Sequence, residues 1–297
     1  GNMILDGVMP DAGRLRRVIA ARSMNLPRGE AALRALRRLR GSKLANLITL
    51  LSMQPLTGDV LMTIRGLAHA PDTDVRLRVL DAREGSRARE DVAIIRAMAR
   101  DTDAVVRQHV IDARRHSEAP EDVELIRALA RDTDTAVRYR VVTARADSRA
   151  PEDVALIRAM ARDTNNGVRQ HVIDARHRSQ APEDVALIRA MARDTDAGMR
   201  QRVVSIRERS EAPEDVALIR AMAHDTDAGV RERVVDARAR SGDPEDVAIF
   251  QRLAHDSDPE VAHSARTSLG AAGIPLENDA ACNTANLLRD VSLGLQN

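Results

Sequence analysis

The sequence is dominated by an internal repeat. The run Pro-Glu-Asp-Val-Ala-Leu-Ile-Arg-Ala-Met-Ala-Arg-Asp-Thr occurs identically at Pro151 and Pro182, and close variants begin at Pro120, Pro213 and Pro244. A constant step of 31 residues separates these starts. A period of about 20 to 50 residues indicates an array of stacked supersecondary units, because each unit buries its apolar face only against its neighbours.

The pattern extends over residues 58–274 as seven repeats of 31 residues, without insertion or deletion. Their boundaries are 58–88, 89–119, 120–150, 151–181, 182–212, 213–243 and 244–274. The first repeat differs most from the others, but Leu61 and Ile64 keep the register of Val92 and Ile95.

The segments on either side match no repeat, and we expect helical caps that cover the apolar ends of the array. Residues 1–57 predict an Arg-rich cap with helices over 10–24, 30–40 and 42–55. Ser42 is the expected N-cap of the third helix. Residues 275–297 predict one capping helix that carries Cys282 as an inert thiol.

Each repeat predicts two antiparallel helices. The proline suits the first position of the first helix, and the following Glu-Asp pair complements the positive end of that helix. The Thr and Asp oxygens of the Arg-Asp-Thr-Asp run can accept amide hydrogens at the start of the second helix. In the repeat 120–150, the periodicity directs Val123, Ile126 and Leu129 inward from the first helix. Val137 and Val141 are expected to point inward from the second helix.

An Asp recurs six residues before the Arg of a Val-Arg or Met-Arg pair. The pairs are Asp101 and Arg107, Asp132 and Arg138, Asp163 and Arg169, Asp194 and Arg200, and Asp225 and Arg231. With the two-helix pattern, these residues resemble the HEAT repeat family and, less closely, leucine-rich-repeat variant proteins. The resemblance implies an all-α fold, an α-solenoid, in which these Asp and Arg residues form a structural ladder within and between repeats. It departs at the ends, where Ala70 replaces the Asp and Ala262 the Arg.

The resemblance also implies that the second helices line a concave surface. With Val106 and Val110 inward, positions 108, 109 and 112 point outward or lie on the flank. The partner-binding candidates are Arg78, Gln108, His109, Tyr139, Arg140, Gln170, His171, Gln201, Arg202, Glu232 and Arg233. Position 112 and its equivalents in the other repeats are Asp81, Asp112, Thr143, Asp174, Ser205, Asp236 and Thr267. These rows predict a polar groove for an extended peptide or partner helix. The alternative is a solvated face with weak ion pairs.

A further row of arginines recurs seven residues after the ladder position. It consists of Arg83, Arg114, Arg145, Arg176, Arg207 and Arg238. Because the row recurs beside apolar positions, we expect it to pair with the acidic turns rather than with a ligand.

Nucleic acid is the alternative partner. The whole chain has a net charge of only +1, but the N-terminal cap is strongly basic. Its candidates are Arg34, Arg37, Arg38, Arg40 and Lys43, and the concave surface adds an Arg row of Arg78, Arg140, Arg202 and Arg233. Contacts to phosphates alone could hold a duplex without reading its sequence. The Asp row of the second helices would oppose this binding.

Enzymatic and metal chemistry find no support in the sequence. No nucleophile-elbow, P-loop or zinc-protease motif occurs. His109 and His171 are two repeats apart, on the order of 20 Å, so they cannot share a metal ion. Aromatic residues make up 1% of the chain, which argues against binding an extruded base or a tetrapyrrole.

The remaining features favour a simple scaffold. A single cysteine fits a reducing compartment, and the longest apolar run, residues 44–53, is too short for the roughly 20 residues of a membrane span. We expect a non-enzymatic, cytoplasmic and monomeric protein that needs no cofactor or metal. Its partner is an unidentified protein or peptide.

Overall fold

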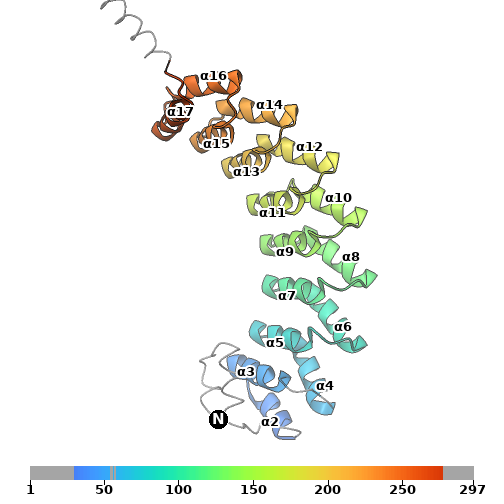
Figure 1. Ribbon diagram of the computed structural model, residues 1–297. Helices are drawn as coiled ribbons and strands as arrows, with labels where there is room; N and C mark the ends of the chain where they lie inside the picture. The colour runs from blue at the N-terminus through green and yellow to red at the C-terminus, as the bar shows by residue number, and fades with distance from the viewer. Residues whose placement is uncertain (1–29, 54–55, 57, 277–297) are drawn as a thin grey trace, which may run out of the picture. The chain divides into compact units, whose positions relative to one another are not determined.

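The computed structural model describes residues 30–53, 56 and 58–276. These residues contain the α-helices α2 to α17 and no strand, which confirms the predicted all-α solenoid of repeats (Figure 1). Contacts divide the chain into two compact units, Gly1–Met160 and Ala161–Asn297, here called the N-terminal and C-terminal units. The predicted helix over 10–24 and the predicted capping helix with Cys282 lie outside the described residues.

The N-terminal unit contains α2 (Glu30–Arg38), α3 (Gly41–Ser52), α4 (Gly58–Gly66), α5 (Thr73–Arg83), α6 (Arg89–Ala97), α7 (Ala104–Arg114), α8 (Pro120–Ala128), α9 (Thr135–Arg145) and α10 (Pro151–Met160). The C-terminal unit contains α11 (Asn166–Arg176), α12 (Pro182–Ala190), α13 (Ala197–Arg207), α14 (Pro213–Ala221), α15 (Ala228–Arg238), α16 (Pro244–Leu253) and α17 (Pro259–Ala271). Most first helices end in a short 3-10 turn, such as η3 (Met98–Arg100).

Within each unit the helices form two rows (Figure 1). In the N-terminal unit, the second helices α5, α7 and α9 stack on one side and the first helices α4, α6, α8 and α10 lie on the other. Helix α3 packs against α5, and so takes the place of a preceding second helix. In the C-terminal unit, α11, α13, α15 and α17 form the corresponding row beside α12, α14 and α16.

Local sequence signals start the helices. Pro120 occupies the beginning of α8, where its missing amide hydrogen costs nothing. The oxygen Oδ1 of Asp134 accepts hydrogen bonds from the amides of Ala136 and Val137, at 2.9 and 3.1 Å. The predicted capping of the second helices is therefore confirmed for the Asp oxygens but not for the Thr oxygens, and Asn165 caps α11.

The core lies between the two rows. Ile126, Val137 and Val141 are fully buried, as the periodicity predicts. Val123 is only half-buried, because the neighbouring Asp122 occupies the inward position at the start of α8. A further apolar position of the second helices is also buried and was not predicted. It is occupied by Leu80, Ile111, Val142, Ile173, Val204 and Val235.

The prediction that Ser42 caps α3 is wrong. The N-cap is Arg40, which has an extended backbone and no capping side-chain bond. Gly41 begins the helix with φ at +53°, in the left-handed region that favours glycine. This conformation lets the chain turn directly from α2 into α3.

Candidate partner-binding surface

One ladder of ion pairs joins successive repeats at their turns. Arg107 donates from Nε and Nη2 to the carboxylate of Asp132 in the next repeat, with both distances 2.7 Å. Its Nη1 donates to the backbone oxygen of Asp101 at 2.8 Å. A guanidinium that binds a carboxylate through two hydrogen bonds fixes geometry as well as charge. The same carboxylate pairing joins Arg76 to Asp101, Arg169 to Asp194, Arg200 to Asp225 and Arg231 to Asp256.

The resemblance implies Asp–Arg pairs both within and between repeats, and the structure shows a different kind of bond in each case. Between repeats the bond joins guanidinium to carboxylate, whereas within a repeat the guanidinium reaches the backbone carbonyl of the Asp. Arg138 likewise donates to the carbonyl oxygen of Asp132 at 2.9 Å, and Oδ1 of Asp163 accepts the amide of Asn165. In the first repeat, Ala70 still supplies its carbonyl oxygen to Arg76, so the replacement loses only the carboxylate.

A second ladder is buried inside the array. Its acids are the aspartates of the Pro-Glu-Asp run and of the matching run in the second repeat, Asp91, Asp122, Asp153, Asp184, Asp215 and Asp246. Asp91 is fully buried and accepts hydrogen bonds from Nε of Arg65 at 2.6 Å, Nη2 of Arg83 at 2.8 Å and Oγ of Ser86 at 2.5 Å. Burial would raise the pKa of Asp91, but hydrogen bonds from Arg65, Ser86 and Arg83 lower it to about 2.

The second ladder corrects two predictions. The Asp of the Pro-Glu-Asp run does not simply complement the helix end in solvent, because it is enclosed between neighbouring repeats. Four members of the further arginine row, Arg83, Arg114, Arg176 and Arg238, bond to these buried aspartates and not to the acidic turns. The constant spacing of eight residues from Arg to Asp was the available sequence signal.

The outward rows of α5, α7 and α9 form what we call the second-helix surface of the N-terminal unit. It consists of Leu77, Arg78, Asp81, Gln108, His109, Asp112, Tyr139, Arg140 and Thr143. Arg78 lies 2.8 Å from Asp81 on its own helix, and Nδ1 of His109 lies 3.6 Å from the same carboxylate. Arg140 approaches Asp112 to 3.6 Å. The second and third repeats therefore direct a basic group toward an acid of the preceding repeat, and basic and acidic groups alternate along the surface.

The C-terminal unit carries the corresponding candidates. Nη2 of Arg202 donates to Asp174 at 2.7 Å, whereas Arg233 lies 3.9 Å from Asp236 on its own helix. The preceding repeat carries Ser205 at the position of Asp174, so it offers no carboxylate there to pair with Arg233. Three further candidates, Gln170, His171 and Glu232, lie on the same row of helices. Gln201 donates to Asp227 at 3.2 Å.

The basic candidates of the N-terminal cap lie on α2 and at the start of α3. Arg34, Arg37, Arg38, Arg40 and Lys43 are all exposed. Arg40 folds back, and its Nη1 donates to the carbonyl oxygens of Arg37 and Leu39 at 2.8 and 2.7 Å. It therefore covers the end of α2 and does not extend freely toward a ligand.

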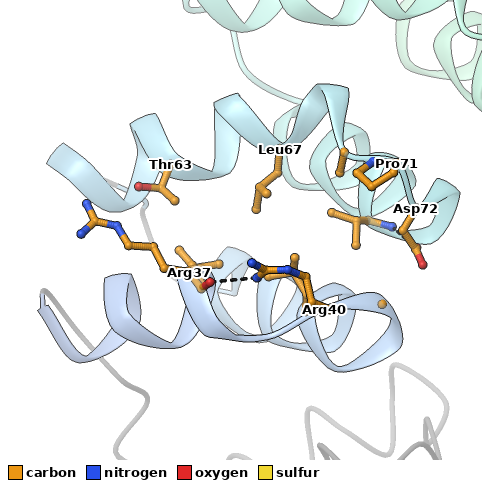
Figure 2. A pocket seen from close by; sticks show the side chains of 11 residues that line it. Arg37, Arg40, Thr63, Leu67, Pro71 and Asp72 are labelled. Atoms are coloured by element: carbon orange, nitrogen blue, oxygen red, sulfur yellow. Dashed lines mark hydrogen bonds between the residues drawn. The ribbon is translucent and has the colours of Figure 1, made fainter.

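A cavity of about 660 Å³ lies beside these arginines (Figure 2). Its apolar lining includes Leu36 of α2, Leu44 of α3, Leu67 directly after α4, and Val75 of α5. Arg37 and Thr63 lie at one end and Asp72 at the other. The apolar walls do not suit a row of phosphates.

No group of three His, Cys, Asp or Glu side chains able to hold a metal ion occurs among residues 30–53, 56 and 58–276. Over the same residues, no helix is both long and apolar enough to cross a membrane.

Comparisons with known proteins agree with this architecture. The family model described as HEAT repeats matches residues 123–207 and 186–270. No curated protein matches the sequence. Two solved structures share the fold. Escherichia coli YibA is 16% identical, with 89% of this chain and 98% of that chain covered and a TM-score of 0.52. A chain from the structure of Kap95p bound to RanGDP is 13% identical, with 91% and 42% covered and a TM-score of 0.59.

Human deoxyhypusine hydroxylase in complex with glycerol is also similar, at 15% identity over 77% of this chain and 89% of that chain. Its TM-score of 0.35 is too low to support an argument. The family match, the stacked helix pairs and the Asp–Arg ladder agree with one another. Residues 123–270 of the chain are HEAT repeats.

Proposed function

We propose that this protein is a non-enzymatic scaffold that binds an extended peptide, or an extended segment of a partner protein, along its second-helix surface. One observation carries the proposal. The residues that the repeats share are used in the core and in the two ladders, whereas this surface differs from repeat to repeat. Gln108 and His109 of one repeat become Tyr139 and Arg140 of the next.

The charge pattern supports a peptide of mixed polarity. His109 and Arg140 each lie close to an acid on the second helix of the preceding repeat, so the surface offers no continuous basic track. Tyr139 adds an aromatic group of the kind enriched at binding sites. HEAT-repeat proteins commonly bind other proteins, and Kap95p binds RanGDP in the similar solved structure.

The test selects peptides that bind the full chain from a displayed random library and then measures their affinity by fluorescence anisotropy. We expect Tyr139→Ala with Arg140→Ala to weaken binding by about tenfold or more, since truncation of a central aromatic or Arg anchor costs about 2 kcal/mol. The matched control is Arg131→Ala, an exposed arginine at the end of the first helix of the same repeat.

Two further measurements complete this test. The melting temperature of the double variant should match that of the wild type, because both side chains lie on the outward surface. A mixed-sequence DNA duplex tests the alternative partner, since phosphate binding weakens steeply between about 50 and 200 mM salt. Equal loss of peptide affinity in the Arg131 variant, or duplex binding tighter than any selected peptide, would remove the proposal.

A further inference from the structure

Arg145 departs from the pattern of its equivalents. In Arg83, Arg114, Arg176 and Arg238, the atoms Nε and Nη2 both donate to one oxygen of the aspartate eight residues later. Arg145 occupies the same position in α9, but its Nε and Nη2 have no hydrogen-bond partner among the described residues. The residue is only 7% exposed.

The aspartate eight residues after Arg145 is Asp153, and both of its oxygens accept hydrogen bonds from other residues. Oδ1 of Asp153 accepts from Arg127 at 2.6 Å and Oδ2 accepts from Ser148 at 2.6 Å. The charge of Arg145 still interacts with Asp153, but its Nε and Nη2 are buried without an acceptor. Such atoms are unfavourable, because they have lost their hydration and no hydrogen bond replaces it. Arg145 is therefore held in a state that a further acceptor would stabilise.

The repeat that contains Arg145 also lacks an acid at one position of the second helix. Two residues before the arginine, the repeats with bonded arginines carry Asp81, Asp112, Asp174 and Asp236. Thr143 stands at this position before Arg145, and Ser205 stands before Arg207, whose Nε and Nη2 also have no partner among the described residues. Both exceptions thus replace a carboxylate with a hydroxyl at the end of the second helix.

A cleft of about 520 Å³ lies next to Arg145, where α7 and α9 end. Its lining includes Arg145, Thr143, Arg115, His116 and Asp147. The volume falls within the range of about 300 to 1,000 Å³ that is typical of ligand sites. All of these residues belong to the N-terminal unit and lie at the end of the helices that form the second-helix surface.

The polar groups of the cleft favour an acid. Arg115 lies on its wall and donates from Nε to His116 at 3.0 Å. The hydroxyl of Ser148 already donates a hydrogen bond to Asp153, and the hydroxyl of Ser117 donates to Asp122. Two acids, Asp147 and Glu118, also line the cleft, but both are exposed to solvent. The buried atoms without a hydrogen-bond partner, Nε and Nη2 of Arg145, belong to a cation.

We propose that this cleft binds a carboxylate of an acidic peptide, with the guanidinium of Arg145 as its donor. The inference rests on the proposed function, since it names the chemistry of one part of the peptide. Four equivalent arginines already use the Nε and Nη2 edge to hold a carboxylate. Because these two atoms of Arg145 are shielded from solvent, the guanidinium turns toward the cleft when the acid binds.

The binding test uses the full chain and labelled oligoglutamate with blocked ends. Oligoglutamine with a free carboxyl terminus distinguishes a terminal carboxylate from a side chain, and oligoglutamine with blocked ends is the blank. We expect Arg145→Gln to weaken binding of one acidic peptide by about tenfold, as for a hydrogen bond to a charged group. The matched control Arg176→Gln, which removes a bonded equivalent, should leave the affinity unchanged. Equal affinity in wild type and Arg145→Gln overturns the proposal.

A measurement on the wild-type chain does not depend on how the variants fold. In nuclear magnetic resonance spectra, the Nε–H signal of Arg145 should differ from the signals of Arg83 and Arg114 and should move toward them when oligoglutamate is added. A signal that already coincides with theirs would place Arg145 on Asp153 in solution and would contradict the inference.

The outcomes separate this inference from the proposed function. If Tyr139→Ala with Arg140→Ala abolishes binding of selected peptides while Arg145→Gln changes neither those peptides nor oligoglutamate, the cleft proposal fails and the scaffold proposal stands. If Arg145→Gln alone weakens oligoglutamate, the cleft binds acids even where the second-helix surface binds no peptide.

Discussion

At the scale of single residues, the buried aspartates are the points where neighbouring repeats are tied together. Asp91 receives hydrogen bonds from α4, from α5 and from the loop that precedes its own helix. Its carboxylate therefore joins three segments of chain. Such a pair is costly to break, because the partner left behind is a buried and uncompensated charge.

The first prediction at this scale concerns Asp91→Asn. We expect the free energy of unfolding to fall by about 3 to 5 kcal/mol, the usual cost of breaking a buried ion pair. The matched control is Glu90→Gln at the neighbouring position, where the side chain is exposed and lies 3.7 Å from the same Arg65. An exposed pair contributes about 0 to 1 kcal/mol. Urea unfolding measures both, and equal losses would contradict the role of Asp91.

The dependence on pH extends this prediction. The pKa of Asp91 is lowered from 3.8 to about 2, so the stability it contributes is complete above pH 3.8 and is lost as the pH falls toward 2. The shift corresponds to about 2 kcal/mol. The difference in stability between wild type and Asp91→Asn should therefore shrink within this range. A difference that stays constant down to pH 2 would show that the carboxylate keeps its ordinary pKa.

At the scale of helices, the capping aspartates decide where each second helix begins. Asp134→Ala removes the acceptor of two amides and should lower the free energy of unfolding by about 1 kcal/mol. Asp134→Asn should retain most of the stability, since Asn165 performs the same role in α11. Thermal unfolding followed by circular dichroism compares the two variants. A loss for the Asn variant as large as that for Ala would show that the charge, and not the cap, matters.

The helices were the part of the structure most accessible to prediction. The step of 31 residues, the prolines and the apolar periodicity are local signals, and they located the helix pairs. The burial of Asp91 was not local, because it depends on Arg65 from the preceding repeat. An Asp in the first turn, such as Asp91 after Arg89 and Glu90, has the ordinary signature of a helix start. Its second role became visible only when neighbouring repeats were placed together.

The candidate site was predictable to a lesser degree. The wheel of the second helix identified Gln108, His109, Tyr139 and Arg140 as outward or flanking, and the structure brings them onto one row of helices. The exceptional state of Arg145 was not predicted, since its repeat position is the same as that of Arg114, and the difference in sequence that accompanies it is Thr143 in place of Asp112. Arg114 donates to Asp122, whereas Nε and Nη2 of Arg145 have no hydrogen-bond partner among the described residues.

At the scale of the whole molecule, the repeat is the unit of construction. Residues shared by the repeats supply the core, the caps and the two ladders, and each repeat takes its partners from its neighbours. In an array of this kind, stability is approximately the sum of repeat and interface contributions. A complete repeat should then be removable, whereas part of one should not.

The most direct measurement is the thermal unfolding of a chain that lacks residues 151–181. This deletion joins Ala150 to Pro182 and places Asp184 where Asp153 meets Arg127, so both ladders keep their register. We expect an unchanged helical signal per residue and a cooperative transition. The matched control lacks only residues 151–165 and should unfold without a cooperative transition, because it brings two second-helix sequences together. A folded control, or an unfolded chain after removal of the complete repeat, would contradict the repeat as the unit of construction.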